Sequence, residues 1–421
     1  MNVDLAAGDD AAIDLTIAEL DRRDPLAALR EQFELPVGVI YLDGNSLGAL
    51  ARPVAERVRS VVTREWGHDL IGAWVSAGWI DLPRRVGAKI APLVGAAPDE
   101  VVVADSTSVN LFKCILAAAD LNRPRTIILT ERGEFPTDVY VSEGVAQATD
   151  GRLRQRLCEP AALAASIDRD TAAVVLSHVH YRSARVRDMA ALTARAHAAG
   201  ALTIWDLSHS AGALRVDLNA AGADFAVGCG YKYLNGGPGA PAFLFAARCH
   251  HAAMRSPLTG WLGHAAPFAF EDGYRPADGV GRFICGTPGV LATSALEASL
   301  DLLRGLDVAA IERKGRELGQ LFIALVERRC AGFGLALASP REPDERGCHV
   351  ALRHPHGYAI MRALIERGVI GDFRDPDVLR FGFAPLYLRY RDVGDAVAIL
   401  RDVLASGTWQ QPRYAERQSV T

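Results

Sequence analysis

The chain has 421 residues, which at about 150 residues per domain leaves room for two or three domains with a sizeable core. Half of the residues are hydrophobic and 23% are charged, a composition that excludes an intrinsically disordered chain. The net charge of -4 offers no basic surface to nucleic acid or to an anionic membrane. The composition therefore favours an enzyme that acts on a small molecule.

The amino terminus, Met1–Asp10, carries acidic residues in place of the basic flank and apolar core of an export signal. No stretch supplies the roughly 18 uninterrupted apolar residues of a membrane span. The seven cysteines are odd in number and widely spread, with no C-x-x-C pair, so neither a disulfide framework nor a metal site is expected. These features predict a cytoplasmic protein without a membrane partner.

Short apolar runs alternate with helical patterns between residues 100 and 250. The predicted strands are Val101–Ala104, Thr126–Leu129, Ala173–Leu176, Leu202–Trp205, Phe225–Val227 and Ala242–Ala246. The connection Asp188–Ala199 is rich in helix formers and stops at Gly200. Strands separated by helices predict an α/β fold with a mostly parallel sheet layered by helices.

The carboxy-terminal part of the chain has a different pattern. A long helical stretch, Leu291–Arg329, precedes two predicted strands, Val350–Leu352 and Leu379–Phe383, which flank a helix over Tyr358–Arg367. This pattern predicts a smaller α+β domain that ends in a frayed tail from Gln410.

The expected organisation has three parts. Residues 1–60 form an amino-terminal segment that packs on the small domain, residues 61–295 form the large domain, and residues 296–421 form the small carboxy-terminal domain. The stretch Pro257–Pro288 contains several glycines and prolines, and we expect it to line a cleft or an interface.

Lys232 is the only charged residue between Phe225 and Ala247. Burial of an ammonium group lowers its pKa and yields the neutral amine that attacks carbonyl groups to form a Schiff base. A buried structural lysine is the alternative. The other three lysines, at positions 89, 113 and 314, lie in amphipathic or charged patterns and are expected on solvated faces.

Asp206 stands at the carboxyl end of a predicted strand, where open α/β sheets bind their ligands. A carboxylate there can hold the proton of a pyridinium nitrogen. Together with a Schiff-base lysine, this is what a protein supplies to pyridoxal phosphate (PLP). The alternative for Asp206 alone is a helix N-cap.

Two further loops follow predicted strands. The segment Asp105–Asn110, DSTSVN, precedes a helix expected from Leu111 and offers backbone N–H groups and hydroxyls to a phosphate, although simple helix capping is the alternative. Phe135, at the start of FPTD, offers an aromatic face to a flat ring. With Asp206 and Lys232, four loops are predicted on one side of one sheet.

Other constellations explain less of the sequence. Gly44–Gly48 matches the G-x-S-x-G nucleophile elbow, with Asp206 and His209 downstream, but too little chain precedes it for the sheet of a hydrolase. His178 and His180, with the same Asp206 and His209, could bind a divalent metal, but this set leaves Lys232 unexplained.

In combination, these motifs resemble those of the kynureninases, which are fold type I PLP enzymes of the class V aminotransferase group. The resemblance runs along nearly the whole chain through YLDGNSLG (41–48), WIDLP (79–83), DSTSVNLFK, FPTD, WDLSHSAGA, GYKYLNGGPGAP and RFGFAPLY (380–387). It implies the PLP-dependent transferase fold and a homodimer with the active site at the subunit interface. The implied reaction is hydrolysis of L-kynurenine to anthranilate and L-alanine, by cleavage of the Cβ–Cγ bond, in tryptophan catabolism.

The resemblance also implies roles for individual residues. Around the cofactor ring it places Lys232 in the covalent link, Asp206 on the pyridine nitrogen, Phe135 on the ring face, and Asp138 and His209 beside the ring. On the phosphate side it places Thr107, Ser108, Ser177 and Tyr231, and from the partner subunit Trp261 and Thr287. Arg380 matches the arginine that binds the substrate α-carboxylate, a task suited to a guanidinium fork. Tyr231, next to the lysine, is the candidate proton donor.

Two positions bear on the aromatic ring of the substrate. Trp74 and Thr287 stand where animal kynureninases resemble one another in having His and Asn. This difference predicts a preference for kynurenine over 3-hydroxykynurenine. One departure from the family pattern is Arg182–Arg185, RSAR, where Thr-Gly is expected after the first arginine.

Two other functions remain as alternatives. A related PLP enzyme such as a cysteine desulfurase would use a thiol, for which Cys330 and Cys348 are candidates. A non-catalytic protein could keep the scaffold for ligand binding, but it would not need Lys232, Asp206 and Arg380 together.

Overall fold

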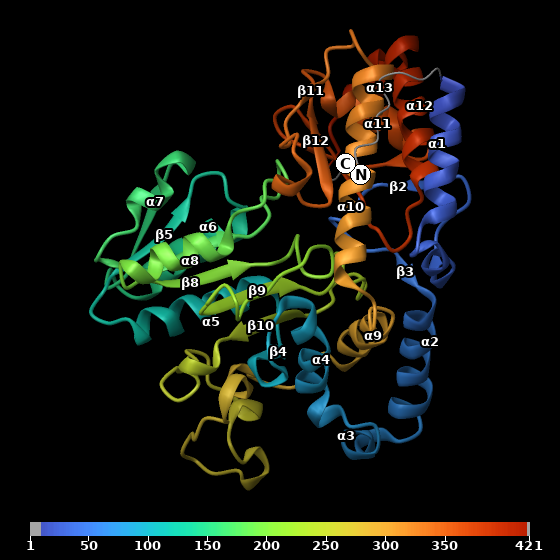
Figure 1. Cartoon of the computed structure of the whole chain (residues 1–421). Helices are drawn as coiled ribbons and strands as arrows, with labels where there is room; N and C mark the ends of the chain where they lie inside the picture. Colours follow the sequence, from blue (N-terminus) through green and yellow to red (C-terminus); the bar gives the residue numbers. More distant parts are fainter. Residues whose placement is uncertain (1–9, 419–421) are drawn as a thin grey trace. The chain divides into compact units, whose positions relative to one another are not determined.

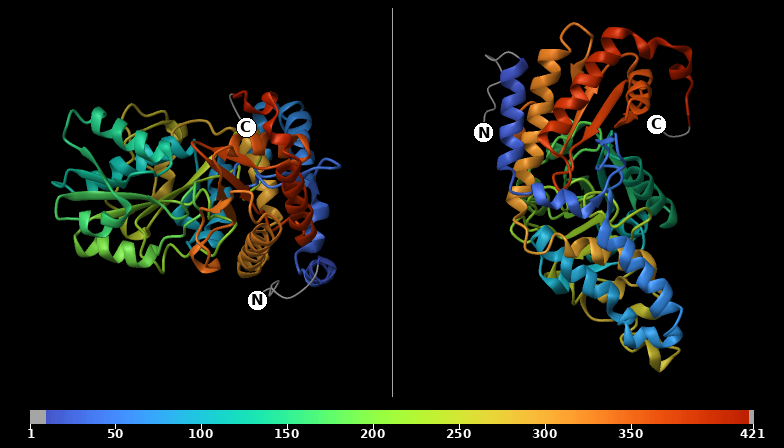
Figure 2. Two further views of the ribbon diagram at one scale, coloured as in Figure 1. Left: turned by 90° about the horizontal axis from the view of Figure 1, so that it is seen from above. Right: turned by 90° about the vertical axis from the view of Figure 1, so that its right-hand side faces the viewer.

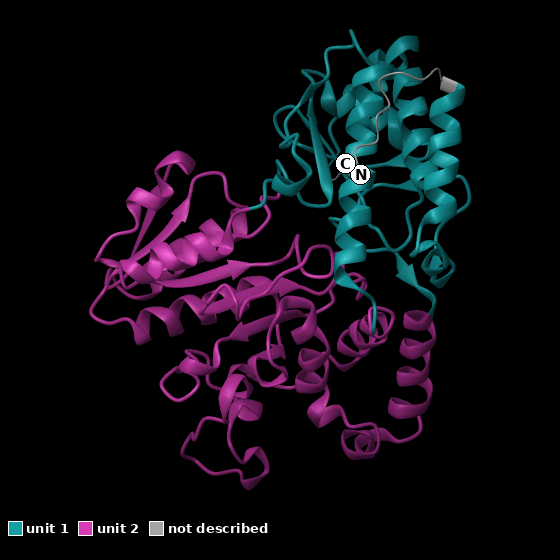
Figure 3. Ribbon diagram, viewed as in Figure 1, with its two compact units in different colours: residues 1–52, 182–186, 305–421 teal, residues 53–181, 187–304 magenta. Residues whose placement is uncertain are grey.

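The computed structural model describes residues 10–418, which divide into two compact units (Figure 3). Among these residues, unit 1 comprises 10–52, 182–186 and 305–418, and unit 2 comprises 53–181 and 187–304. The stretch Met1–Asp10, on which the prediction about an export signal depends, lies outside the described residues except for its last residue. Within residues 10–418, no helix combines the length and the apolar character needed to cross a membrane.

Unit 2 is built on a seven-stranded sheet with the order β4-β10-β9-β8-β7-β5-β6 (Figure 1). Its strands are β4 (Val101–Val103), β5 (Ile127–Glu131), β6 (Arg154–Cys158), β7 (Thr171–Ser177), β8 (Leu202–Asp206), β9 (Phe225–Cys229) and β10 (Ala242–Ala246). All six predicted strands are present. The sequence does not predict β6, because this edge strand reads RQRLC and lacks an apolar run.

The sheet is mostly parallel, as predicted, with one exception. Strands β5 to β9 pair in parallel, whereas β10 runs antiparallel to both β9 and β4. The segment 230–241 between β9 and β10 contains no helix, so the chain turns back beside the strand it has just left. This turn carries Lys232 at the edge where the parallel strands end.

Helices cover the sheet, and some of them begin within five residues of the end of a strand. The helices of this unit include α2 (Arg52–Ser60), α3 (Ala73–Ser76), α4 (Leu82–Ile90), α5 (Thr107–Leu121), α6 (Pro136–Ala148), α7 (Leu163–Ser166), α8 (Met189–Ala198) and α9 (Val290–Asp301). The core packs Leu111 and Ile115 of α5 against the strand residues Val175, Ile204 and Phe225. Helix α5 begins four residues earlier than predicted, because Ser106 caps it.

Unit 1 contains a four-stranded antiparallel sheet with the order β11-β12-β15-β14. Its strands are β11 (Ala336–Leu337), β12 (His349–Arg353), β14 (Asp372–Arg374) and β15 (Val378–Gly382), and short pairs join β1 (Phe33–Glu34) to β3 (Leu50–Ala51) and β2 (Ile40–Tyr41) to β13 (Val369–Ile370). Helices α1 (Asp10–Arg23), α10 (Val308–Arg329) and α12 (Tyr390–Ser406) lie side by side, and α11 (Gly357–Glu366) packs on β15 (Figure 2).

Two predictions about unit 1 and its junction are wrong. The helical stretch Leu291–Arg329 is interrupted between α9 and α10, where Gly305 has a left-handed backbone (φ +78°). The tail is not frayed throughout, because α13 (Pro412–Ala415) forms and buries Tyr414.

The loop that departs from the family pattern lies in unit 1. Ala184 has a left-handed backbone (φ +62°), a conformation that favours glycine, which explains why glycine is expected there. The loop is held by backbone hydrogen bonds from Val186 N to Glu345 O and from Gly347 N to Ala184 O.

Candidate active site

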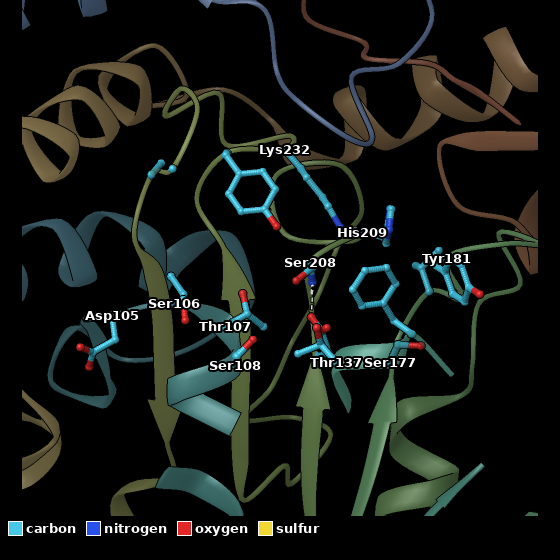
Figure 4. Close-up of a pocket in the computed structure, with 17 residues that line it drawn as sticks. Asp105, Ser106, Thr107, Ser108, Thr137, Ser177, Tyr181, Ser208, His209 and Lys232 are labelled. Carbon is cyan, nitrogen blue, oxygen red and sulfur yellow. Dashed lines mark hydrogen bonds between the residues drawn. The ribbon is translucent and has the colours of Figure 1, made fainter. Parts of the chain in front are cut away.

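A cavity of about 380 Å³ opens in unit 2 at the edge where the parallel strands end (Figure 4). The residues that line it are Asp105, Ser106, Thr107, Ser108, Phe135, Thr137, Ser177, Val179, Tyr181, Asp206, Ser208, His209, Tyr231, Lys232, Gly239, Ala240 and Ala242. The four loops predicted to meet on one side of the sheet therefore do so. The volume lies within the range of small-molecule sites.

One end of the cavity is formed by the start of α5. Ser106 is the N-cap residue, and its Oγ accepts a hydrogen bond from Val109 N at 3.4 Å. Figure 4 shows the side chains of Asp105, Ser106, Thr107 and Ser108 together on this side. A helix start directs unsatisfied backbone N–H groups and positive dipole charge outward. With the hydroxyls of Thr107 and Ser108, this end suits a phosphate group.

The opposite wall carries Asp206, the last residue of β8. Its Oδ1 accepts a hydrogen bond from Ser208 N at 2.7 Å, the dashed line in Figure 4. Burial raises the pKa of this carboxyl above its ordinary value, against the lowering effects of the Ser208 hydrogen bond and of Lys232. A buried carboxyl that faces a cavity gains most from a cationic N–H donor placed in that cavity.

Lys232 extends into the cavity from the turn after β9. Its Nζ lies 3.1 Å from Nε2 of His209 and 5.8 Å from the centroid of the Phe135 ring. Figure 4 shows Lys232 and His209 side by side above the ends of the strands. A half-buried primary amine is therefore held between an imidazole and the face of an aromatic ring.

Asp138 lies beneath this region, in the first turn of α6. It is fully buried, and neither carboxyl oxygen has a hydrogen-bond partner among the described residues. Burial, followed by the charges of Asp206 and Glu134, raises its pKa well above the ordinary value. Asp138 therefore adds a second, electrically coupled carboxyl beside Asp206.

The structure does not bring every predicted residue to its expected place. Ser177 was assigned to the phosphate side, but its Oγ donates to Glu134 at 2.5 Å, and it lies across the cavity from Asp105 and Ser106 (Figure 4). Tyr231 does line the cavity, and burial, followed by the charge of Cys229, raises the pKa of its hydroxyl, which therefore stays protonated.

The three residues linked to the partner subunit or to the substrate ring lie elsewhere. Trp74 and Trp261 meet edge to face, with ring centroids 6.5 Å apart, and neither is among the residues that line the cavity. Thr287 lines a second cavity of unit 2, together with Asp105 and Gly239. Within one copy of the described chain, these side chains do not contribute to the Lys232 cavity.

Arg380 belongs to unit 1, on β15, and is almost fully buried. Asp372 stands directly opposite it on β14, and its carboxylate accepts hydrogen bonds from Nε at 2.8 Å and from Nη2. Nη2 also donates to Ser46 Oγ at 2.9 Å. Burial alone would raise the pKa of Asp372, but Arg380 and Arg374 hold it below its ordinary value. A buried ion pair of this kind fixes the plane of the guanidinium fork.

Burial disfavours the ionised form of a second carboxyl near this pair, that of Asp43. Burial, followed by the charge of Asp372, raises the pKa of Asp43 to about 7. An acid with a raised folded-state pKa stabilises the fold when it is protonated, and this contribution is lost as the pH rises from its unfolded pKa towards about 7. Asp43→Asn should therefore gain stability relative to the wild type as the pH rises from about 4 to about 7. Urea unfolding at several pH values checks this, and a stability difference independent of pH would contradict it.

Two predictions about lysines are wrong. Lys113 is fully buried and donates to Asp105 and to the Phe283 carbonyl oxygen at 2.6 Å. Lys314 is also buried, with its Nζ 2.6 Å from Asp24 Oδ2. The amphipathic and charged patterns around them do not reveal these contacts, because Phe283 and Asp24 come from distant segments and Asp105 lies before the helix that carries Lys113. The sequence analysis also misses Glu134, a buried acid that binds Ser177 and Arg187, because no motif marks it.

The alternative sites find little support. Ser46 of the elbow motif is engaged within unit 1, where its hydroxyl donates to Asp372 Oδ2 at 3.0 Å and accepts from Arg380 Nη2 at 2.9 Å. Within residues 10–418, no three His, Cys, Asp or Glu side chains are grouped so as to hold a metal ion.

The candidate thiols of a desulfurase are also poorly suited to reaction. Cys330 and Cys348 are buried, and burial raises their pKa values to about 11 and about 12, so both stay as unreactive thiols.

Comparison with known proteins gives consistent results. Residues 311–400 match the family described as the kynureninase C-terminal domain. A kynureninase of Burkholderia mallei is 51% identical over 407 residues, covering 96% of this chain and 98% of the relative. A kynureninase of Pseudomonas fluorescens is 50% identical over 409 residues, with the same coverage.

Solved structures share the fold at much lower identity. The apo cysteine desulfurase of Thermococcus onnurineus has a TM-score of 0.77 at 19% identity, covering 91% of this chain and 99% of that one. A C-DES structure with glycine covalently linked to its PLP cofactor has a TM-score of 0.76 at 18% identity, covering 89% and 99%. These similarities show the fold type I architecture and no more.

Proposed function

On the premise that this chain belongs to the kynureninase family, the PLP-dependent enzymes that hydrolyse L-kynurenine to anthranilate and L-alanine, we propose that the cavity around Lys232 is its active site. The observation that carries the proposal is the meeting of a primary amine, a buried acid and a helix start around one cavity. We propose a place in tryptophan catabolism and the kynurenine pathway towards NAD biosynthesis, in the cytoplasm. All seven cysteines are present as thiols, which supports a reducing compartment.

The cavity fits PLP at each of its ends. The start of α5 matches the phosphate, Phe135 offers a ring face, and Lys232 offers the amine for covalent attachment. Asp206 is a buried acid to which no basic side chain of residues 10–418 is hydrogen-bonded, which suits a protonated ring nitrogen. When bound, PLP supplies an electron sink next to the bond that breaks.

The chain's own residues handle the protons. We propose that the Lys232 amine accepts the Cα proton of the substrate. His209, 3.1 Å from Lys232 Nζ, orients this amine. The Tyr231 hydroxyl, which burial keeps protonated, is proposed to donate a proton to the leaving fragment.

Substrate binding is proposed to involve Arg380. Asp372 fixes the plane of the guanidinium through Nε and Nη2, and we propose that this positioned guanidinium binds the α-carboxylate of kynurenine. Ser46 Oγ, 2.9 Å from Nη2, adds a second restraint on the same group.

One experiment tests the function directly. The purified protein is supplied with PLP, and its visible absorbance is recorded before and after addition of L-kynurenine. The expected result is a coloured protein that releases anthranilate, followed by its fluorescence, and one equivalent of L-alanine. A protein that binds PLP but leaves kynurenine unchanged would overturn the proposal.

The residues assigned to the substrate ring predict a substrate preference. Trp74 is an aromatic side chain, and Thr287 carries a single small hydroxyl, in place of the His and Asn expected where a ring hydroxyl is bound. A site with fewer polar partners compensates less well for the desolvation of that hydroxyl. We expect kcat/KM to be on the order of tenfold or more higher for kynurenine than for 3-hydroxykynurenine. Equal values for the two substrates would contradict this.

A second copy of the chain is proposed to complete the site. Trp261 and Thr287, assigned to the partner's cavity, do not line the cavity of their own chain. Unit 2 also exposes a row of apolar side chains, Trp66, Leu70, Ile71 and Val75, on the segment before α4. Exposed apolar patches of this kind are typical of subunit interfaces.

This proposal predicts the assembly state. Light scattering after gel filtration should give twice the mass of the chain. The double variant Ile71→Glu/Val75→Glu places two charges where side chains are 81% and 86% exposed, so it should leave the fold intact and yield a monomer. Val37→Glu, at a fully exposed position of unit 1, is the matched control and should remain a dimer. A double variant that stays dimeric would place the interface elsewhere.

A further inference from the structure

The buried Lys113 has no role in the proposed reaction, yet it sits directly beneath the phosphate end of the cavity. It lies on α5 with no exposed surface, and its Nζ donates to the carboxylate of Asp105 and to the Phe283 carbonyl oxygen at 2.6 Å. Fully buried lysines are rare, because the ammonium must give up its hydration. The ion pair with Asp105 is what compensates for this burial.

The backbone of Asp105 has a conformation that few residue types adopt. It has a left-handed backbone (φ +45°), a conformation that Asp and Asn tolerate better than other residues with side chains. Its carbonyl oxygen accepts a hydrogen bond from Ala242 N at 2.9 Å. The Asn110 side chain donates to the neighbouring Ala104 carbonyl oxygen at 2.8 Å. The turn from β4 into α5 is therefore fixed at the residue that precedes the capping Ser106.

Asp105 also creates an electrostatic problem. Its side chain is about one third exposed (32%) and lines the cavity beside Ser106, Thr107 and Ser108. A carboxylate in that place repels the phosphate dianion that the helix start attracts. A buried ammonium in contact with the carboxylate cancels this repulsion and adds no charge of its own at the cavity surface.

We propose that Lys113 is a positioning residue for cofactor binding, which neutralises Asp105 and holds the turn that directs the start of α5 at the phosphate. This inference rests on the proposed function, since it concerns the phosphate of PLP. It predicts that Lys113 and Asp105 act in opposite directions on the binding of the phosphate, and only on that part of the cofactor.

The experiment compares PLP with pyridoxal, which has the same ring and aldehyde but lacks the phosphate. Dissociation constants for both are measured on the apoprotein by quenching of intrinsic fluorescence. For Lys113→Met, we expect the preference for PLP over pyridoxal to fall on the order of tenfold, because Asp105 is left without its counter-charge. If Lys113 had a merely structural role, the substitution would weaken the binding of PLP and of pyridoxal equally, and the ratio of their dissociation constants would not change.

A second variant keeps the test decisive if Lys113→Met folds poorly. Asp105→Asn removes the negative charge and retains a residue that accepts the left-handed backbone. The preference for PLP over pyridoxal should then stay at the wild-type value or increase. A ratio that falls in Asp105→Asn would overturn the inference. The double variant Asp105→Asn/Lys113→Met should recover most of the wild-type ratio, and a ratio as low as that of Lys113→Met would also overturn it.

Lys89→Met is the matched control. Lys89 is a partly exposed lysine of the same unit that pairs with Asp301 and Glu297, away from the residues that line the cavity. It should keep the wild-type ratio. If the wild-type protein does not bind PLP at all, the proposed function itself is contradicted. If the wild-type protein binds PLP and Lys113→Met keeps the wild-type ratio of the two dissociation constants, only this inference is contradicted.

Discussion

Lys232→Ala should reduce the turnover of kynurenine by at least about four orders of magnitude and remove the visible absorbance of the lysine-bound cofactor. Nζ is the only primary amine among the residues that line the cavity, and it lies 3.1 Å from His209. Its loss would remove both the proposed point of covalent attachment and the group proposed to move the Cα proton. The fold should persist, because Lys232 is half-buried and lies in a turn outside the sheet.

The measurements are anthranilate release and the absorbance spectrum of the protein supplied with PLP. Lys89→Ala is the control, since it removes an amine from α4 and should leave both signals intact. Added methylamine should restore a small part of the turnover in Lys232→Ala, because a free amine can enter the space that the side chain vacates. Turnover within tenfold of the wild type would mean that another residue supplies the base.

Asp206→Asn should lower kcat by about two to three orders of magnitude while the cofactor stays bound. The substitution preserves an oxygen that can accept the Ser208 N–H, and so removes only the negative charge. Without that charge, the ring nitrogen would lose the partner proposed to keep it protonated, and the cofactor would be a poorer electron sink.

The stability of the Asp206→Asn apoprotein distinguishes a loss of catalysis from damage to the fold. Because burial raises the pKa of Asp206, the ionised carboxylate costs the apoprotein free energy, and Asp206→Asn should be as stable as the wild type or more stable above pH 5. Thermal unfolding of the apoprotein measures this. Asp188→Asn, at the N-cap of α8, is a control that should change neither turnover nor cofactor binding. Full turnover in Asp206→Asn would contradict the assigned role.

The sequence alone predicts much of the site because its chemistry is carried by short segments between a strand and a helix. The runs before Ser106, Phe135 and Asp206 indicate strands, and the capping and glycine signals after them indicate where each chain segment turns. Since the carboxyl ends of parallel strands share one edge, these loops are expected to meet, and around the 380 Å³ cavity they do.

Contacts between distant segments are decided only by the tertiary structure. The sheet register places Asp372 opposite Arg380, and packing brings Phe283 to Lys113 and Asp24 to Lys314. An amphipathic pattern states which face of a helix is apolar, but it does not identify the distant carboxylate that allows a lysine to be buried there. The charge of a buried group is compensated by partners that folding assembles. Short motifs therefore specify the chemistry of this protein's loops, whereas the pairing of the charges beneath them depends on contacts that form on folding.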